Sequence, residues 1–131
     1  MDKIKASVFI LTKNSGTTIS RALDSVASFD DVVICDGGSK DETLDIASKF
    51  GARIFSQSSE CLENGKVQDF SCLRNKCMAY CENDWVLYID SDETTSFGLV
   101  EEISKVVSGR LRYDAYRVPA GIIVDGRRII Y

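Results

Sequence analysis

The sequence predicts an α/β protein, in which a parallel sheet carries helices on both faces, and three observations lead to this class. Short apolar runs that suit buried strands alternate with longer segments of helical periodicity. Alternating strands and helices are typical of parallel sheets with right-handed crossovers. The last part of the chain shows strand patterns only, and Asp125-Gly126 between two apolar runs is a strong signal for a hairpin. We therefore expect a C-terminal β-hairpin appended to the parallel sheet.

The first half of the chain is expected to form three strands and two helices. The strands are predicted at 6–11, 31–35 and 52–55. Apolar residues at helical spacing predict that the first helix runs to about Phe29, where Asp30-Asp31 should break it. Ser39 and Glu42 fit a capping box for the second helix, and Gly51 should end that helix.

The second half begins with a polar loop at 56–65, which leads into a helix at 67–81. A strand at 85–89 and a helix at 98–107 complete the alternation. The remaining elements are a strand at 113–118 and the two arms of the hairpin, at 121–124 and 127–131. A chain of 131 residues with this pattern is expected to form a single domain, 1–131.

The apolar run 85–89 stops abruptly in Asp90-Ser91-Asp92-Glu93. Five large apolar residues in a row suit a strand that is buried on both faces, in the middle of a parallel sheet. Residues i and i+2 of an extended segment point the same way, so Asp90 and Asp92 should lie side by side. Hard oxygen ligands suit Mg²⁺ or Mn²⁺. The stretch therefore predicts a divalent metal held at the end of a central strand.

Further polar residues are expected at the same edge of the sheet. Asp36 ends the second strand, and Thr12 and Asn14 follow the first. In open α/β sheets, ligands bind outside the carboxyl ends of the strands. The turn Gly37-Gly38-Ser39 could offer backbone amides and a helix N-terminus to a negatively charged group. Together with the metal, this combination suits a nucleotide diphosphate.

Plainer interpretations of the same residues stay open. Gly37-Gly38 is a turn signal in its own right, and Asp36 could simply cap the helix that follows. Arg74, beside Leu73 on the third predicted helix, is either a surface residue or a contact for the diphosphate.

Composition excludes several classes of function. The formal net charge is −4 and no long basic run occurs, so a nucleic acid is not an expected partner. No apolar stretch approaches the roughly 20 residues of a membrane span, and the N-terminus lacks the features of a signal peptide. A cytoplasmic protein is therefore expected. The chain has no histidine, so acid–base chemistry would fall to carboxylates or lysine.

The cysteines are odd in number and show no Cys-x-x-Cys spacing, which argues against a disulfide framework and against a zinc site. We expect buried thiols instead, with Cys77 and Cys81 one helical turn apart on a stripe that faces the core. The five cysteines are Cys35, Cys61, Cys72, Cys77 and Cys81.

Four ordered motifs resemble those of the inverting family 2 glycosyltransferases, which have the GT-A fold. They are 7–14, 32–43, Leu73-Arg74-Asn75 and 85–93, and the resemblance covers about residues 6 to 119. The motifs are most similar to those of the branch that contains lipopolysaccharide-core and β-1,4-glucosyltransferases, which run Thr-x-Asn, Asp-x-Gly-Ser-x-Asp-x-Thr, Arg-Asn and Asp-x-Asp-Glu. The resemblance implies a Rossmann-like sheet that binds a nucleotide sugar.

The resemblance also implies roles for individual residues. Asp36 would contact the base or ribose of the nucleotide, Asp90 would face the sugar, and Asp92 would bind Mn²⁺ or Mg²⁺, with Asp90 close by. The same pocket would be lined by Thr12, Asn14, Gly38 and Arg74. The implied reaction is a single displacement with inversion, in which a hydroxyl of a glycan or lipid-linked acceptor attacks the donor sugar. Such an enzyme would work in the cytoplasm, or at the cytoplasmic face of the membrane with peripheral contact to it.

The chain departs from the family pattern at two points. Many members carry a second Asp at the position of Gly37. The family's catalytic base is a carboxylate in the acceptor half, beyond the end of this sequence, so the catalytic residue is unknown. The resemblance therefore implies the N-terminal, donor-binding half of a longer enzyme.

Three rival interpretations stay open. Asp90 and Asp92 also match the first motif of haloacid-dehalogenase-like phosphatases, as nucleophile and acid–base residue, although Lys105 is the single lysine after them. A receiver-like or interaction domain could hold Mg²⁺ with the same acids. A domain that binds nucleotide sugar without catalysis is the third.

Overall fold

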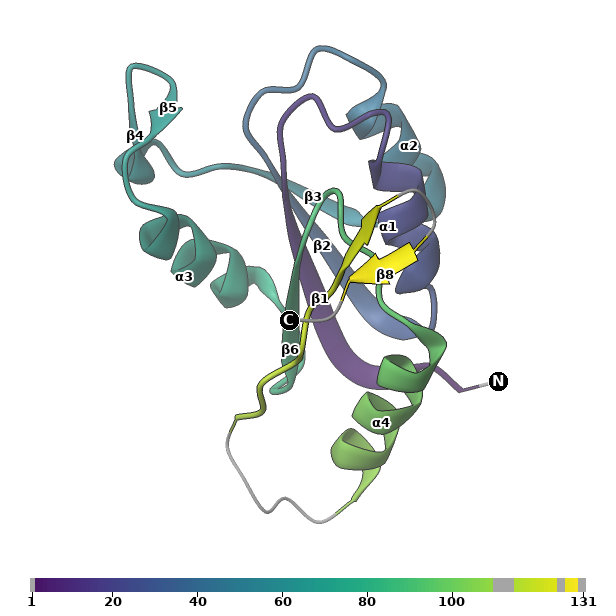
Figure 1. The fold of residues 1–131 in the computed structure, drawn as a ribbon. Coiled ribbons are helices and arrows are strands. Elements are labelled where there is room, and N and C mark those ends of the chain that lie inside the picture. Colours follow the sequence, from purple (N-terminus) through teal and green to yellow (C-terminus); the bar gives the residue numbers. More distant parts are fainter. Residues whose placement is uncertain (1, 110–114, 125–126, 130–131) are drawn as a thin grey trace.

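A four-stranded parallel sheet forms the centre of the fold, as the sequence predicts (Figure 1). The computed structural model describes residues 2–109, 115–124 and 127–129. The strand order is β3-β2-β1-β6. These strands are β1 (Ile4–Thr12), β2 (Phe29–Asp36), β3 (Arg53–Ser56) and β6 (Val86–Asp90).

Helices cover both faces of this sheet. One face carries α1 (Ile19–Ser25), α2 (Thr43–Phe50) and α4 (Phe97–Ser108), and the other carries α3 (Phe70–Tyr80). On the first face, Val8 and Ile10 of β1 pack among the apolar residues of the three helices. On the second face, Phe9 and Val33 pack with Cys77 of α3. None of the helices in the described ranges is long and apolar enough to span a bilayer.

The strands that are buried on both faces and paired on both sides are β1 and β2, rather than β6. Val8, Phe9 and Ile10 are at most 1% exposed. Within the described residues β6 pairs only with β1, and most of its side chains are half-buried. The expectation of a central strand at 85–89 was therefore wrong. An apolar run indicates cover on both faces of a strand, but it does not reveal how many neighbouring strands pair with it.

The first helix is shorter than predicted, since α1 ends at Ser25 and Phe29 begins β2. Val26 and Phe29 are both buried, and the Phe29 amide donates to the Val26 carbonyl over 3.1 Å in the turn between helix and strand. Apolar residues three positions apart can therefore be buried by a turn as well as by a helix. Asp31, predicted to break the helix, lies in β2 at 5% exposure, where it accepts hydrogen bonds from Ser7 and Arg53.

The predicted capping box of α2 does not form. The Asp41 carboxylate accepts from the backbone amide of Thr43 at 3.0 Å, and its second oxygen accepts from the Gly16 amide at 2.9 Å. The Ser39 hydroxyl donates to Asp36 instead. The predicted end of the helix is confirmed, because Gly51 follows α2 in the left-handed conformation, with φ 94°.

The polar segment after β3 contains more structure than predicted. A 3-10 turn, η1 (Ser59–Cys61), precedes a small hairpin of β4 (Leu62–Glu63) and β5 (Lys66–Val67). Asn64 and Gly65 connect the two strands, both with positive φ, which a tight hairpin turn of this kind requires. Figure 1 shows this ribbon beside the start of α3, away from the central sheet.

Of the two elements predicted for the C-terminal part, a strand and a hairpin, the hairpin is confirmed. Residues 115–118, predicted as the end of a strand, carry no regular secondary structure, and 113–114 lie outside the described residues. The hairpin is present as β7 (Ile122–Val124) and β8 (Arg127–Ile129). Its predicted turn, Asp125-Gly126, lies outside the described residues.

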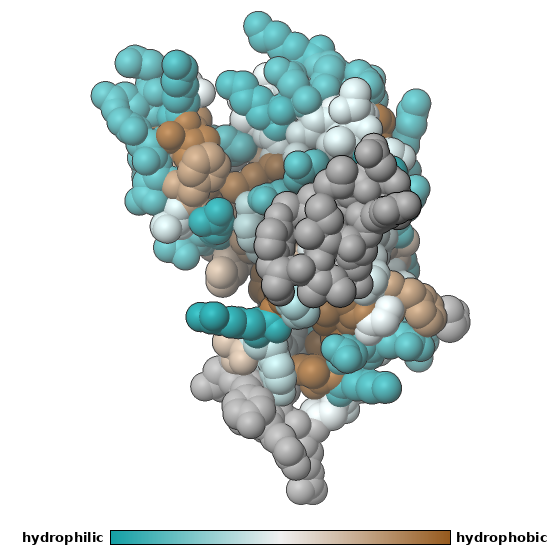
Figure 2. Space-filling view, viewed as in Figure 1, coloured by the Kyte–Doolittle hydropathy of each residue, from teal (hydrophilic) through white to brown (hydrophobic). Residues whose placement is uncertain are grey.

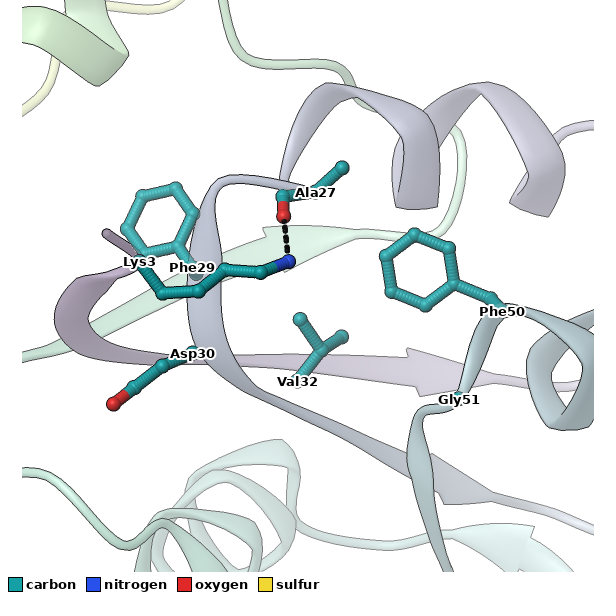
Figure 3. A pocket seen from close by; sticks show the side chains of 7 residues that line it. All are labelled: Lys3, Ala27, Phe29, Asp30, Val32, Phe50 and Gly51. Carbon is teal, nitrogen blue, oxygen red and sulfur yellow. Dashed lines mark hydrogen bonds between the residues drawn. The ribbon is translucent and has the colours of Figure 1, made fainter. Parts of the chain in front are cut away.

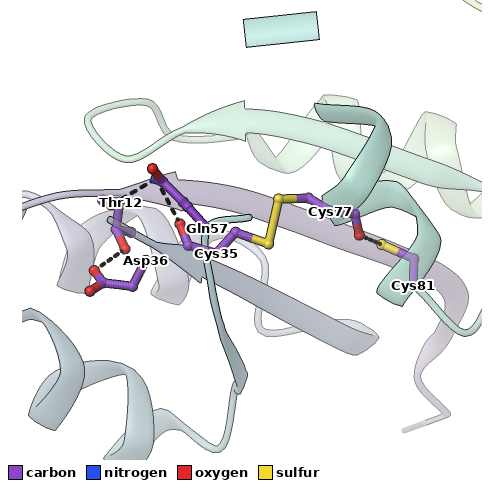
Figure 4. The surroundings of a disulfide bond; sticks show 6 residues. All are labelled: Thr12, Cys35, Asp36, Gln57, Cys77 and Cys81. Atoms are coloured by element: carbon purple, nitrogen blue, oxygen red, sulfur yellow. Dashed lines mark hydrogen bonds between the residues drawn. A yellow bond between two sulfur atoms is a disulfide. The ribbon is translucent and has the colours of Figure 1, made fainter. Parts of the chain in front are cut away.

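The cysteines form two disulfides, Cys35–Cys77 and Cys61–Cys72, which overturns the expectation of unpaired thiols. Figure 4 shows the first of them. The Cα atoms lie 6.3 Å and 5.6 Å apart, inside the range that a disulfide requires. The packing of α3 on β2 brings Cys77 to Cys35, a contact between residues 42 positions apart that spacing along the chain does not reveal. Cys77 faces the core as predicted, whereas the free Cys81 follows the end of α3.

Candidate functional site

Three neighbouring strands bring polar residues to one edge of the sheet. In the pairing of β1 with β2, Thr12 lies opposite Asp36, and in the pairing of β1 with β6, Leu11 lies opposite Asp90. The carboxyl ends of β2, β1 and β6 therefore bring Asp36, Thr12 and Asp90 to one edge of the sheet. Thr12 and Asp36 share one face, whereas Asp90, opposite Leu11, lies on the other. In Figure 2, hydrophilic residues cover the upper end of the molecule, where Figure 1 places the loops that follow β1 and β2.

Asp36 is the centre of a hydrogen-bond network within its own loop. Its carboxylate accepts from the Thr12 hydroxyl at 2.7 Å, from the Ser39 hydroxyl at 2.6 Å, and from the amides of Gly38 and Ser39 at 2.9 and 2.7 Å. Burial, which leaves the side chain 6% exposed, would raise the pKa of Asp36. The hydrogen bonds from Ser39 and Thr12 outweigh this effect and lower the pKa, so the carboxylate is charged.

The turn after Asp36 does not present free amides to a ligand, which corrects the sequence interpretation. The Gly37 amide donates to the Thr12 carbonyl at 2.8 Å, and the next two amides donate to Asp36. The Lys40 amide donates to the Asn14 side chain at 2.8 Å. The loop is therefore a closed structure, and Gly38 contributes a positive φ of 92° rather than close approach to a ligand.

Asn14 joins this loop to the one that follows β1. The backbone amide of Asn14 donates to the Ser39 hydroxyl at 2.8 Å, and the Asn14 side-chain oxygen accepts from the backbone amide of Lys40. Asn14 itself has a φ of 49°, a conformation that asparagine tolerates better than most residues. The structure thus gives Asn14 and Asp36 a clear role in holding two loops of the candidate site together.

Gln57 is a residue of this edge that the sequence did not single out. Its side-chain amide donates to the carbonyls of Thr12 and Cys35, each over 3.3 Å (Figure 4). A side chain at Gly37 would meet it, since a Cβ atom there would lie 2.9 Å from the Gln57 Oε1. Gln57 therefore fills the space beside the turn and ties the ends of β1 and β2 together.

The acids after β6 are more open than Asp36. Asp90, Asp92 and Glu93 are all exposed, and the Tyr88 hydroxyl donates to Asp90. Burial first, and then the neighbouring Asp90 and Asp92, raise the pKa of Glu93. Ser91 anchors this loop, because it accepts a hydrogen bond from the Ser15 hydroxyl over 3.0 Å. Negative charge thus gathers at the end of β6.

The donor set fits a divalent ion that arrives with a phosphate ligand. The described residues contain no group of three or more acids, cysteines or histidines arranged to hold a metal by themselves. Mg²⁺ is usually bound by one or two carboxylates together with waters and the phosphates of a substrate. Asp90 and Asp92 are exposed carboxylates of this kind. They are not neighbours in an extended segment, as predicted, because Ser91 and Asp92 form a turn that the Glu93 amide closes by donating to the Asp90 carbonyl at 3.0 Å.

Arg74 reaches the same region from α3. Its guanidinium carbon lies 5.1 Å from the centre of the Tyr88 ring and 5.9 Å from that of Phe70. Tyr88 is two residues before Asp90 on β6, so Arg74 lies over the strand that ends in the acids. The structure therefore places a cation on the α3 side of the candidate site.

Two hollows of the surface lie away from the acids. One of about 310 Å³ is found at the amino end of β2, opposite to the acids, and there the Lys3 ammonium donates to the Ala27 carbonyl at 2.6 Å (Figure 3). A larger groove of about 460 Å³ lies between α4, β6 and residues 115–119. Neither is lined by Asp36, Thr12 or Asp90, so the candidate site is identified by its residues and not by these two hollows.

Comparison with known proteins shows the family to which this chain belongs. Residues 7–113 match the family described as glycosyl transferase family 2. An uncharacterized glycosyltransferase of Rickettsia conorii is 38% identical over 117 residues, which cover 87% of this chain and 39% of the relative. The glycosyltransferase SunS of Bacillus subtilis is 32% identical over 98 residues, covering 74% of this chain and 22% of SunS. The chain spans about two fifths of the length of its Rickettsia relatives.

Solved structures of similar fold include proteins from two other bacteria. TarS of Staphylococcus aureus, residues 1–349, superposes with a TM-score of 0.63 at 25% identity, over 79% of this chain and 32% of the TarS chain. Glucosyl-3-phosphoglycerate synthase of Mycobacterium tuberculosis, in complex with Mn²⁺, UDP and glucosyl-3-phosphoglycerate, gives a TM-score of 0.58 at 25% identity, over 80% of this chain and 40% of the synthase chain.

The parallel sheet with flanking helices is thus the Rossmann-like GT-A fold of glycosyltransferases. More narrowly, the chain belongs to glycosyl transferase family 2.

Proposed function

We propose that this chain is the donor-binding part of a glycosyltransferase that moves a sugar from a nucleotide diphosphate to an acceptor hydroxyl. The observation that carries the proposal is the convergence of Asp36, Thr12 and Asp90 at the ends of three neighbouring parallel strands, in a chain of family 2. Solved relatives of similar fold are complexes with UDP, which supports a uridine nucleotide as the first donor to test.

The structure supports a division of labour within the site. Asp36, with both oxygens occupied by the loop, would fix the shape of the surface that meets the base or ribose, together with Thr12, Asn14 and Gly38. Because the loop amides are engaged internally, the charge of the diphosphate would fall to other groups. Arg74 is the cation of the described residues that lies over β6 and is suited to this contact.

Asp92, with Asp90, would hold Mn²⁺ or Mg²⁺ at the end of β6. Such an ion would relieve the repulsion among the acids and, when bound, would stabilise negative charge on the leaving diphosphate. The complex of the mycobacterial synthase with Mn²⁺ and UDP supports a divalent metal. Asp90 would additionally face the sugar.

We further propose inversion at the transferred sugar, with the base supplied by a carboxylate outside this sequence, since the chain has no histidine. The acceptor would be a glycan or a lipid-linked glycan of the cell envelope, as the lipopolysaccharide-core-like motifs suggest. The enzyme would act in the cytoplasm or in peripheral contact with the inner face of the membrane.

Calorimetry with UDP and GDP, with and without Mn²⁺, tests the donor site. We expect binding of one nucleotide that depends on Mn²⁺, and a loss of affinity of about tenfold or more in Asp92→Asn, because one charged ligand of the ion is removed. Glu101→Gln, an exposed acid of α4, is the matched control and should bind like the wild type. Binding that is independent of the metal, or unchanged in Asp92→Asn, would contradict the proposal.

The alternatives make different predictions in two further assays. Family membership argues against the phosphatase interpretation, which requires phosphate to be released from a phosphate ester through attack by Asp90. Absence of this activity, combined with slow hydrolysis of a UDP-sugar, favours the transferase. Binding of the UDP-sugar without any hydrolysis would favour a domain that holds the donor without catalysis.

A further inference from the structure

Tyr88 connects the two charged groups of the candidate site that come from different elements. Its hydroxyl donates to the Asp90 carboxylate, and the Arg74 guanidinium of α3 lies 5.1 Å from the centre of its ring. Tyr88 and Asp90 are two residues apart on β6, so their side chains lie on the same face of the strand. One side chain thus contacts both the acid and the arginine.

The packing around Tyr88 fixes the ring. It stacks on Phe9 of β1, with centroids 4.9 Å apart and planes 27° from parallel. Phe9 itself is 1% exposed, so this partner cannot move without disturbing the core. A tyrosine held in this way directs its hydroxyl to a defined point, whereas Asp90, at the exposed end of the strand, would otherwise sample several rotamers.

The chemistry of the two groups suits this task. A carboxylate can only accept hydrogen bonds, and a phenol hydroxyl can donate one. The Tyr88 hydroxyl can therefore orient Asp90 without removing its charge.

We propose that Tyr88 is a positioning residue of the donor site: its hydroxyl orients Asp90 towards the sugar of the donor, and its ring supports Arg74 at the diphosphate. This inference rests on the proposed function. It assigns separate tasks to the two parts of one side chain, and the hydroxyl can be removed while the ring is kept. Loss of the hydroxyl would affect recognition of the sugar, while loss of the ring would also affect recognition of the nucleotide.

Two substitutions separate these tasks. Tyr88→Phe keeps the ring, its stacking on Phe9 and its contact with Arg74, and removes only the hydroxyl. Tyr88→Leu removes the ring as well. Tyr80→Phe is the matched control, because Tyr80 lies at the end of α3, stacks on Phe55, and its carbonyl accepts from Arg53 at the start of β3. Thermal melts of all the variants report whether the fold is retained.

The measurement compares calorimetric affinities in Mn²⁺ for UDP and for its glucose, galactose and N-acetylglucosamine conjugates. The readout is the Kd of the conjugate that the wild type binds best, divided by the Kd of UDP. This ratio reports how much the sugar contributes to binding. We expect Tyr88→Phe to raise this ratio about fivefold, the typical effect of one lost hydrogen bond, with the Kd of UDP unchanged. Tyr88→Leu should weaken UDP as well, and Tyr80→Phe should change neither value.

The outcomes distinguish the inference from the function on which it rests. If the wild type binds neither UDP, GDP nor any conjugate, the donor site itself is refuted. If the wild type binds them and the ratio in Tyr88→Phe equals that of the wild type, the positioning role is refuted and the donor site stands. Equal weakening of UDP and the conjugate in Tyr88→Phe, with a lowered melting temperature, would show that Tyr88 acts through packing alone and would equally overturn the inference.

Discussion

Thr12 and Asp36 lie opposite one another at the ends of β1 and β2, and the Thr12 hydroxyl donates to the Asp36 carboxylate over 2.7 Å. Both residues are buried, at 2% and 6% exposure. A hydrogen bond between side chains therefore joins β1 and β2 where their backbone hydrogen bonds end. The loops of the candidate site begin at these two residues. The stability of these loops should depend on this one carboxylate.

Asp36→Asn should lower the free energy of unfolding by about 3 kcal/mol, because an amide nitrogen would face donors that now point at a carboxylate oxygen. Whichever way the amide turns, either the Thr12 and Ser39 hydroxyls or the loop amides lose an acceptor. Urea unfolding measures the change. Asp45→Asn, an exposed acid of α2, should be within about 0.5 kcal/mol of the wild type. A similar small effect for Asp36→Asn would show that the network contributes little.

Acid should destabilise the protein through Asp31 and Asp36. The pKa values of both are lowered in the folded state, despite the opposing effect of burial, by hydrogen bonds from Arg53 and Ser7 to Asp31 and from Ser39 and Thr12 to Asp36. The folded state then binds protons less readily than the unfolded state, so the stabilisation is complete above the ordinary pKa of 3.8 and is lost as the pH falls below it.

Urea midpoints measured between pH 7 and pH 3 test this dependence. We expect little change down to about pH 5 and a steep fall below about pH 4. The fall should be shallower in Asp36→Asn, which lacks one of the two groups. Equal midpoints for the wild type at pH 7 and pH 3 would contradict the assignment.

Reduction of the disulfides should lower stability without unfolding the sheet. The Cys35–Cys77 bond closes a loop between residues 42 positions apart, and a loop of this length is worth about 3 to 4 kcal/mol in the unfolded-chain model. We expect a lower melting temperature in a phosphine reductant, and an intact mass that rises by the four hydrogens of two reduced bonds. Cys81→Ser should respond to the reductant like the wild type. A protein purified without reductant that already carries five free thiols would refute the pairing.

Cys81 should react slowly with alkylating agents while the protein is folded. Burial, with a further contribution from Asp31, raises the pKa of the Cys81 thiol to about 11, so little thiolate is present near pH 8. Labelling by iodoacetamide, followed by mass spectrometry of the peptide, should be about tenfold or more slower in buffer than in urea. Equal rates in the two conditions would show that the thiol is accessible and ordinary.

Much of the candidate site was predictable because its residues follow apolar strands. An apolar run followed by an acid fixes both the strand and the end at which the acid lies, and this located Thr12, Asp36 and Asp90 at one edge. Arg74 follows the buried Leu73 on α3 and lies over Tyr88 of β6, while its predicted contact with a diphosphate stays a prediction. These inferences need only local periodicity and the rule that parallel strands share their carboxyl ends.

The rest depended on contacts between distant parts of the chain. Nothing in the local pattern shows that Cys77 meets Cys35, or that the Gln57 side chain reaches two strand ends. Tyr88 looked like one more apolar residue of a strand, although its hydroxyl contacts Asp90. A local signal was missed in one case, since Asn64-Gly65 is a strong hairpin dipeptide within the segment predicted to be a loop.

The contact between Gly37 and Gln57 links two positions that are 20 residues apart in the sequence. An aspartate at position 37, as many family members carry, would displace the Gln57 side chain and break its hydrogen bonds to the carbonyls of Thr12 and Cys35. The two positions should therefore covary among relatives, with a residue other than glutamine at 57 wherever 37 is acidic. For protein engineering, an acid at 37 should be combined with a shorter side chain at 57, so that no displaced glutamine has to find a new position.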